Sequence, residues 1–220
     1  MPQGGVISPL LANIALDGME ALLNTHQTTR EYTVKTGQWV GKVTKKKVNT
    51  YGLIRYADDF LITAETKEEI EAIIPVIGEW LKSRGLAFNE EKTKIRHLSA
   101  GINFFGCNVK QYGSKCLIKP QKEKVIAKIK EIKFWLNTHP DISPEAVIRV
   151  INPILRGWAN YYKHGASKET FEYFDDRVWQ LLMTWATKRH PNKGKRWVVL
   201  RYFGRLGNDH GVFKANAPDR

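Results

Sequence analysis

The sequence predicts an α+β protein in which helices and antiparallel strands are followed by a bundle of helices. Two β-prone runs, residues 52–56 and 60–64, flank an Asp-Asp dipeptide, which is the layout of a tight hairpin. A helix with a capping box follows this hairpin. After Pro120 the apolar residues recur only with helical spacing. The boundary between residues 1–119 and 120–220 is therefore expected near Pro120.

The first helix is predicted to run from Ser8 to about Asn24. Ser8 and Pro9 provide a start signal, and apolar residues follow at helical spacing. Residues 28–50 are polar, with a lysine run and a strand-like stretch at residues 39–43. We interpret this segment as a loop or ribbon insertion whose lysines form a solvated face.

Thr66 and Glu69 have the spacing of a capping box for the next helix, and Gly85 supplies its end. A further hairpin is expected at residues 103–118, with its turn at residues 112–114.

Three helices are then predicted at residues 121–137, 144–163 and 168–190, the second interrupted at Pro153. Aromatic residues that recur at helical spacing in these segments are assigned to packing: Trp158, Phe171, Phe174 and Trp179.

The charge balance favours a polyanionic partner. The net charge is +13, divided as +4 in residues 1–119 and +9 in residues 120–220. Each neutralised phosphate releases condensed counterions, so nucleic acid binding should depend mainly on the C-terminal half. A merely soluble basic chain and an anionic membrane surface are the alternatives. No apolar run is long enough to span a membrane and no signal peptide is evident, so a cytoplasmic protein without a membrane partner is expected.

Cys107 and Cys116 have no second cysteine pair and no histidine at ligand spacing. Neither a zinc site nor a disulfide framework is therefore predicted. We interpret both as small buried hydrophobic residues.

Asp58 and Asp59 are the strongest candidates for chemistry. Two adjacent carboxylates at a hairpin tip repel each other, and a divalent cation relieves that repulsion. Mg²⁺ ions held in this way can activate a hydroxyl and stabilise a leaving pyrophosphate. The alternative is an ordinary turn in which an aspartate caps the backbone.

The segment of residues 56–60, Tyr-Ala-Asp-Asp-Phe, resembles the metal-binding motif of reverse transcriptases. Residues 2–14 resemble the upstream family segment that lies beside the template and the incoming nucleotide. Residues 84–94 and 104–106 resemble the next motif and the primer-grip hairpin. The four motifs follow the family's order, so residues 1–119 resemble the C-terminal part of a polymerase palm.

The resemblance implies that Asp58 and Asp59 are catalytic and bind Mg²⁺. It also implies substrate contacts for the following residues: Gln3, Gly4, Tyr56, Ala57 and Lys92. Glycine lets the backbone approach a base pair closely, and a lysine can neutralise the leaving pyrophosphate. The alternatives are a packed strand aromatic at Tyr56 and an ordinary exposed Lys92.

Residues 155–164 resemble the maturase-specific thumb of group II intron proteins, so the whole chain resembles a group II intron reverse transcriptase and maturase. Aromatic residues interleaved with cations favour RNA contact over a plain solvated helix face. The predicted RNA-binding residues are Lys124, Lys128, Arg156, Tyr161, Lys163, Lys188, Arg189, Lys195 and Arg196.

The resemblance implies an RNA-directed DNA polymerase that is also a splicing cofactor, with group II intron RNA, a DNA primer or target and deoxynucleotide triphosphates as partners. Family members carry fingers and an earlier palm strand with another metal-binding aspartate. Asp17, expected inside a helix, cannot replace it. Little or no polymerase activity is therefore expected of this chain without the N-terminal part of the polymerase or a second copy.

The rival hypothesis is a non-catalytic RNA-binding maturase or a truncated remnant. A retron or diversity-generating reverse transcriptase is a further alternative, which residues 156–164 argue against.

Overall fold

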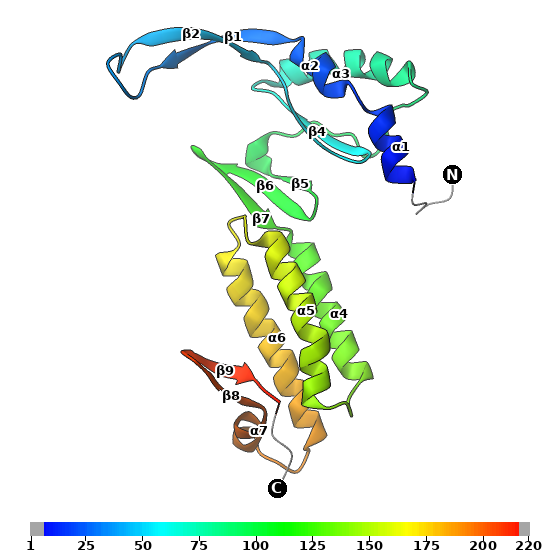
Figure 1. Cartoon of the computed structure of the whole chain (residues 1–220), viewed down its shortest axis with the longest axis vertical. Helices are drawn as coiled ribbons and strands as arrows, with labels where there is room; N and C mark the ends of the chain where they lie inside the picture. Colours follow the sequence, from blue (N-terminus) through cyan, green and yellow to red (C-terminus); the bar gives the residue numbers. More distant parts are fainter. Residues whose placement is uncertain (1–6, 216–220) are drawn as a thin grey trace. The chain divides into compact units, whose positions relative to one another are not determined.

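The computed structural model describes residues 7–215 and divides the chain into two compact units, residues 1–95 and 96–220 (Figure 1). Each unit has its own apolar core, and the predicted α+β class is confirmed. The two units divide between residues 95 and 96, which is earlier than the domain boundary expected near residue 120. The reason is that the strands at residues 102–120 pack on the helices that follow them. Cys107 contacts the core of these helices, and the hydroxyls of Tyr161 and Tyr162 donate to the carbonyls of Phe105 and Gly106. Among residues 7–215, no helix is long and apolar enough to cross a membrane.

The N-terminal unit contains α1 (Ser8–Ala15), α2 (Met19–Asn24), β1 (Gln27–Thr33), β2 (Val43–Asn49), β3 (Gly52–Tyr56), β4 (Asp59–Thr63) and α3 (Lys67–Lys82). Its strands form two separate antiparallel pairs, β1 with β2 and β3 with β4.

The single helix predicted over residues 8–24 is wrong, because the chain forms two helices there. Gly18 adopts a left-handed φ of 88° and begins α2, a conformation that glycine reaches without a Cβ penalty. Asp17 therefore lies in the turn between the helices rather than inside one. In α2, Met19 and Leu23 are fully buried, whereas no residue of α1 is buried.

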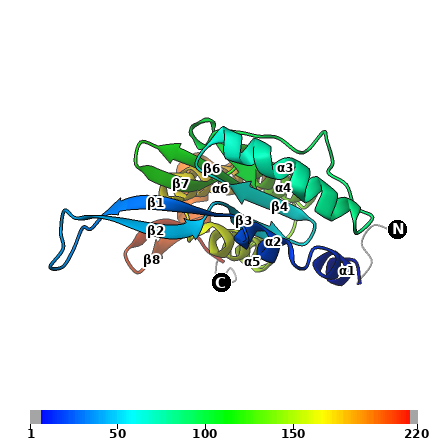
Figure 2. The same cartoon turned by 90° about the horizontal axis from the view of Figure 1, so that it is seen from above.

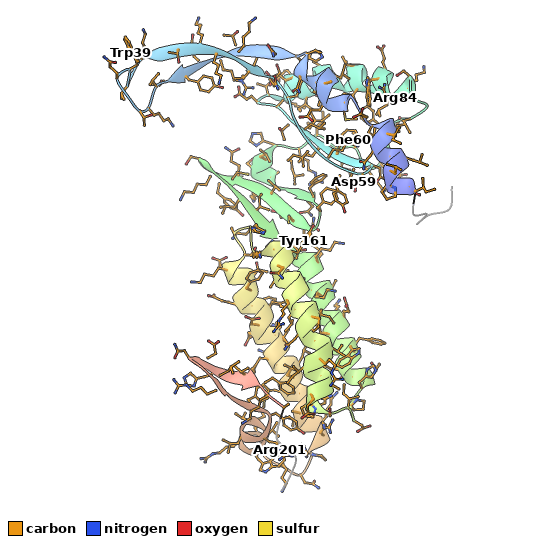
Figure 3. The ribbon with its side chains drawn as sticks, viewed as in Figure 1. Trp39, Asp59, Phe60, Arg84, Tyr161 and Arg201 are labelled. Atoms are coloured by element: carbon orange, nitrogen blue, oxygen red, sulfur yellow. The ribbon has the colours of Figure 1, made fainter. Side chains whose placement is uncertain are left out.

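The polar insertion is a two-stranded ribbon. β1 and β2 pair from Gln27 opposite Asn49 to Thr33 opposite Val43. The first four residues of the strand-like stretch predicted at residues 39–43 instead lie in the loop between β1 and β2, and only its last residue belongs to β2. Trp39 lies in this loop (Figure 3). The lysines of β2 are exposed.

The tight hairpin is confirmed by the antiparallel pairing of β3 and β4. The capping box is also confirmed: the Thr66 hydroxyl accepts from the Glu69 backbone N–H at 3.2 Å, and the Glu69 carboxylate accepts from the Thr66 N–H at 3.2 Å. α3 lies beside the hairpin in both views (Figure 2). Their shared core contains Leu53, Phe60, Ile62, Ile73, Ile77 and Leu81.

The C-terminal unit contains a short 3-10 turn (Leu98–Ala100), β5 (Ile102–Phe104), β6 (Cys107–Tyr112), β7 (Lys115–Pro120), α4 (Lys122–Thr138), α5 (Pro144–Tyr162), α6 (Lys168–Arg189), α7 (Lys195–Tyr202), β8 (Phe203–Leu206) and β9 (Asp209–Phe213).

The strands β5, β6 and β7 form one antiparallel sheet in sequence order. The predicted turn is confirmed, since Tyr112 pairs with Lys115 across two residues. The sheet has a further strand, β5, which joins β6 through Phe105 and Gly106, both with positive φ. Cys116 is exposed, so its assignment to the interior is wrong, whereas Cys107 is half-buried and burial raises the pKa of its thiol.

The three predicted long helices are confirmed as α4, α5 and α6, which run side by side (Figure 1). The interruption expected at Pro153 is wrong, because α5 continues through this exposed residue. The helix α7 and the hairpin β8–β9 were not predicted. Trp179 packs against Phe203 of this hairpin and donates from Nε1 to the Gly211 carbonyl at 3.1 Å, although the residue is 39% exposed.

Candidate functional site

The turn between β3 and β4 carries both predicted catalytic carboxylates. Ala57 and Asp58 form the turn, and Asp59 begins β4, where it pairs with Tyr56. Ala57 has a φ of 53°, as the first central residue of a type II′ turn requires. Glycine usually occupies this position because a Cβ is strained there. Strain of this kind often accumulates at functional sites.

The two faces of the hairpin have different surroundings. Tyr56 lies opposite Asp59, and Arg55 lies opposite Phe60. Phe60 packs on the apolar core, and side chains alternate along a strand, so Tyr56 and Asp59 belong to the other face. Tyr56 is 70% exposed, and Asp58 and Asp59 are exposed as well. The hairpin therefore presents both carboxylates to solvent rather than to the packed interior.

Asp17 lies near the face of the same hairpin that carries Arg55. With Glu20 and Arg55 it lines a polar hollow, and the Arg55 guanidinium donates to the Asn13 side-chain oxygen at 3.2 Å. Arg55 belongs to the face opposite Asp59. Asp17 thus cannot complete the carboxylate pair, and within residues 7–215 no group of three metal-binding side chains gathers.

The structure brings together only some of the predicted substrate contacts. Tyr56 and Ala57 belong to the same turn as the carboxylates. Lys92 lies on a separate loop after α3, where its backbone N–H donates to Asn89, and its ammonium forms no ion pair with either carboxylate. Gln3 and Gly4 lie outside the described residues.

Four of the predicted RNA-binding cations lie on α4 and α5. Lys124, Arg156 and Lys163 are exposed. Arg156 and Lys163 are seven residues apart on α5, so they share one side of the helix. Lys128 forms an ion pair with Glu131 at 2.6 Å, so its ammonium group is less available to a phosphate.

The last turn of α6 contains two cations with structural partners. The Arg189 guanidinium donates to the backbone carbonyls of Pro140 and Ile142 and lies 4.8 Å from the ring centre of Trp185. Lys188 donates to the Asn137 side chain at 3.1 Å. These contacts attach the end of α6 to the last turn of α4 and to the α4–α5 loop, so Arg189 in particular stabilises the fold.

Lys195 and Arg196 lie exposed in the first turn of α7, which contains no acidic residue. Cations at a helix N-terminus oppose the helix dipole, at a cost of about 0.3–1 kcal/mol each when exposed. They do not stabilise α7.

Two adjacent tyrosines on α5 have different environments. Tyr161 is 58% exposed, and its hydroxyl donates to the Phe105 carbonyl at 2.7 Å. Tyr162 is buried, its hydroxyl donates to the Gly106 carbonyl at 3.2 Å, and burial is the main cause of its raised pKa. Only Tyr161 can offer its ring to an RNA base.

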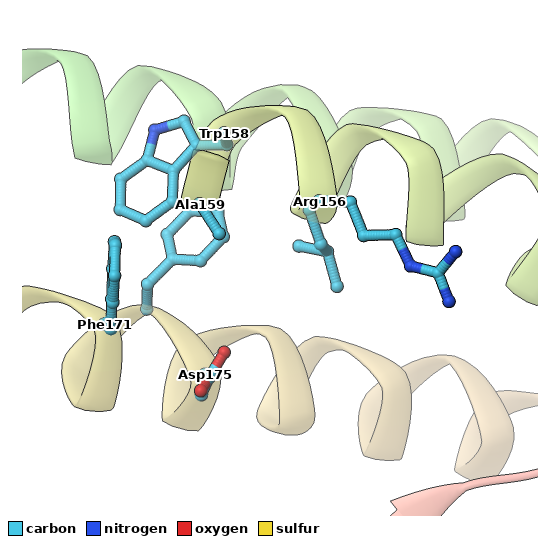
Figure 4. Close-up of a pocket in the computed structure, with 7 residues that line it drawn as sticks. Arg156, Trp158, Ala159, Phe171 and Asp175 are labelled. Carbon is cyan, nitrogen blue, oxygen red and sulfur yellow. The ribbon is translucent and has the colours of Figure 1, made fainter. Parts of the chain in front are cut away.

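A cavity of about 220 Å³ lies between α5 and α6 (Figure 4). Its walls are apolar apart from Arg156 and Asp175. The Asp175 side chain is exposed, and partial desolvation raises the pKa of its carboxyl. Sequence reasoning missed Asp175, although it follows Phe171 by four residues and so shares its side of α6. That spacing was the available signal.

The comparisons with known proteins match both halves of the chain. The model for reverse transcriptase (RNA-dependent DNA polymerase) matches residues 1–109. The model for the group II intron maturase-specific domain matches residues 123–203.

Three curated relatives are similar to between about half of this chain and nearly all of it. Protein YkfC of Escherichia coli K12 is 37% identical over 120 residues, covering 48% of this chain and 31% of YkfC. Group II intron-encoded protein LtrA of Lactococcus lactis subsp. cremoris is 24% identical over 244 residues, covering 79% of this chain and 41% of LtrA. An uncharacterized 91 kDa protein in the cob intron of Schizosaccharomyces pombe is 23% identical over 282 residues, covering 99% of this chain and 34% of that protein.

The chain thus spans less than half the length of each of these relatives. A reverse transcriptase match followed in the same chain by a maturase-specific match shows that this protein belongs to the group II intron reverse transcriptase and maturase family.

Proposed function

We propose that this chain supplies the metal-binding turn of an RNA-directed DNA polymerase and a surface that binds group II intron RNA. One observation carries the first part: Asp58 is exposed in a strained two-residue turn, and Asp59, also exposed, begins β4 opposite Tyr56 on the face away from the core. A solvated pair of adjacent carboxylates costs stability through repulsion, which a divalent cation removes.

Carboxylate oxygens are the ligands that Mg²⁺ prefers in proteins, so Asp58 and Asp59 fit as its holders. Bound there, Mg²⁺ would activate a primer 3′-hydroxyl and stabilise the leaving pyrophosphate of a deoxynucleotide triphosphate. Tyr56, on the same face as Asp59, would position the primer end. Ala57 leaves room beside the turn for the growing duplex. We assign Lys92 to the pyrophosphate on the resemblance alone.

The exposed cations of the C-terminal unit support the RNA-binding part. Arg156 and Lys163 share one side of α5, and Lys195 and Arg196 begin α7. None of these four is buried in the fold, and each can neutralise a phosphate. Residues 120–220 form the maturase-specific half in this proposal, and residues 1–119 the palm half.

A non-catalytic RNA-binding maturase is the second candidate. The observation that favours it is that residues 7–215 bring two carboxylates, without a third metal-binding side chain, to the turn. Two ligands hold a divalent ion weakly. We therefore expect this chain by itself to give little or no cDNA from an RNA template with Mg²⁺, and robust primer extension would contradict that expectation.

Metal binding and RNA binding can be tested separately on the intact chain. Mn²⁺ binding, followed by electron paramagnetic resonance, should be lost in Asp58→Asn and in Asp59→Asn. It should be retained in the matched control Asp141→Asn, which removes an exposed carboxylate from the α4–α5 loop. All three variants should bind intron RNA as the wild type does. Equal Mn²⁺ binding by all four proteins would refute the metal site, and absence of RNA binding would refute the maturase surface.

A further inference from the structure

The cavity between α5 and α6 has a preformed aromatic floor. The rings of Trp158 and Phe174 are stacked, with centres 4.2 Å apart and planes 12° from parallel. Trp158 is 9% exposed and Phe174 is 2% exposed, so both are fixed by core packing. Phe171 stands edge-on to Trp158 at 5.4 Å and forms one end of the cavity. Close-packed rings move little, so the shape of the cavity does not depend on a ligand.

The two charged residues of the cavity come from different helices. Arg156 on α5 lies at the end away from Trp158 and Phe171, and Asp175 on α6 points toward α5 between these ends (Figure 4). Within residues 7–215, neither side chain forms a hydrogen bond or an ion pair. Both side chains are exposed to solvent, so each can contact a ligand without first breaking a contact within the fold. A few polar groups beside an apolar hollow are the usual arrangement of a ligand site.

The size of the cavity limits what it can hold. Pockets that enclose whole small-molecule ligands measure roughly 300–1,000 Å³, whereas this one measures about 220 Å³. It therefore has room for one flat group rather than for a nucleotide with its sugar and phosphate. The apolar floor can bury one side of a planar ring, and the exposed Arg156 suits an anion attached to that ring.

We propose that this cavity receives one unpaired guanine base of RNA, with Asp175 accepting hydrogen bonds from the base and Arg156 contacting the adjoining phosphate. The proposal rests on the RNA-binding function proposed above. A carboxylate only accepts hydrogen bonds, so its best partner presents two neighbouring donors on one edge. Guanine does so through N1–H and the N2 amino group. Adenine and cytosine place an acceptor beside their amino group, and uracil has a single N–H donor.

The test measures binding of the intact chain to short fluorescent oligouridylates that carry one central guanosine, adenosine or inosine. The wild type should bind the guanosine strand more tightly than the adenosine strand by about fivefold to a hundredfold, the range of one good bidentate contact. Inosine lacks the N2 amino group, so its strand should lose part of this preference.

Two matched variants isolate the carboxylate. Asp175→Asn should abolish the preference for guanosine, because an amide presents only one acceptor, while affinity for the adenosine strand is retained. Asp176→Asn makes the same charge change one residue away, where the carboxylate accepts only from Gln180 on its own helix, and should keep the preference.

Arg156→Gln should weaken binding to all three strands by a similar factor. Thermal unfolding of each variant confirms that it is folded.

The outcomes separate this inference from the proposed function. If the wild type binds all strands equally, or if the two aspartate variants behave alike, the guanine site is wrong and general RNA binding stands. If no strand and no intron RNA binds, both proposals fail. A preference for adenosine overturns the assigned hydrogen-bond pattern.

Discussion

Tyr56 lies directly opposite Asp59 across the two-residue turn that ends the β3–β4 hairpin. The register therefore places an aromatic ring and a carboxylate on one exposed face, while Phe60 turns into the core. Only a two-residue turn gives this arrangement, because a shift of one residue would reverse every side chain of β4. The geometry of Ala57 thus controls where the carboxylates point.

Ala57 should tolerate glycine but not a β-branched residue. Its φ of 53° is strained by about 1–2 kcal/mol for a residue with a Cβ, and valine adds crowding at χ1. Alanine already carries the Cβ strain, so Ala57→Val should lower the unfolding free energy of the N-terminal unit only by its added rotamer strain, about 0.5–1.5 kcal/mol. Ala57→Gly should leave it equal or higher. Urea unfolding of both variants measures the difference, and a larger loss with glycine would contradict the turn geometry.

The Thr66 hydroxyl should contribute measurably to α3. It accepts from the Glu69 N–H, and removing such a cap costs about 0.5–2 kcal/mol. Thr66→Ala should therefore lower the unfolding free energy by about 1 kcal/mol. Thr66→Ser retains the hydroxyl and serves as the control, with a loss well below that of alanine. The same urea titrations check this, and equal losses would refute the cap.

Tyr161 should separate fold stability from RNA binding. Tyr161→Phe removes the hydrogen bond to the Phe105 carbonyl, so stability should fall by about 0.5–1.5 kcal/mol. The ring remains, so affinity for single-stranded RNA should hardly change. Tyr161→Ala removes the ring as well and should weaken RNA binding by about 1–3 kcal/mol. Unfolding and fluorescence anisotropy provide the two measurements. Equal RNA affinities for the phenylalanine and alanine variants would exclude base stacking.

His190 should make the C-terminal unit less stable in weak acid. Burial, and then the nearby cations led by Arg189, lower its pKa below the ordinary 6.5. Its Nε2 lies 2.7 Å from the Tyr202 hydroxyl. Between the folded pKa and 6.5 the unfolded chain binds a proton that the folded protein does not. The contribution of His190 is therefore complete above pH 6.5 and is lost as the pH falls toward the folded pKa.

Thermal unfolding between pH 7.5 and pH 5 should show this decline. His190→Gln cannot titrate, so its melting temperature should vary less over the same interval. A wild type and a variant with parallel pH profiles would exclude His190 as the source.

The first turn of α7 should account for part of the salt dependence of RNA binding. Lys195 and Arg196 each release counterions if they neutralise a phosphate. Replacing both by glutamine should reduce the slope of log affinity against log salt by about 0.7 for each phosphate that they neutralise on a single strand. Lys67→Gln is the control, because Lys67 forms an ion pair within α3. Unchanged slopes in the double variant would place the RNA elsewhere.

Local sequence signals determined a large part of this protein. The capping box at Thr66 and Glu69, the hairpin around Asp58 and Asp59, and the three long helices depend on residues a few positions apart. Such interactions are the same in any surroundings, so the sequence reveals them. The motif order, too, indicated the family that the domain matches show. The metal-binding roles of Asp58 and Asp59 stay a prediction.

Tertiary structure decided which side chains remain available to contact RNA. Tyr161 and Tyr162 look equivalent in the sequence, and both hydroxyls donate to carbonyls 56 residues away, yet only Tyr162 is buried, because its ring packs in the core beside Trp158. Arg189 looks like a phosphate contact until its acceptors on the α4–α5 loop are seen. Asp175 becomes a candidate only because α5 and α6 together form the cavity that it lines. Burial depends on contacts between residues far apart in the chain, so periodicity within a helix cannot determine it.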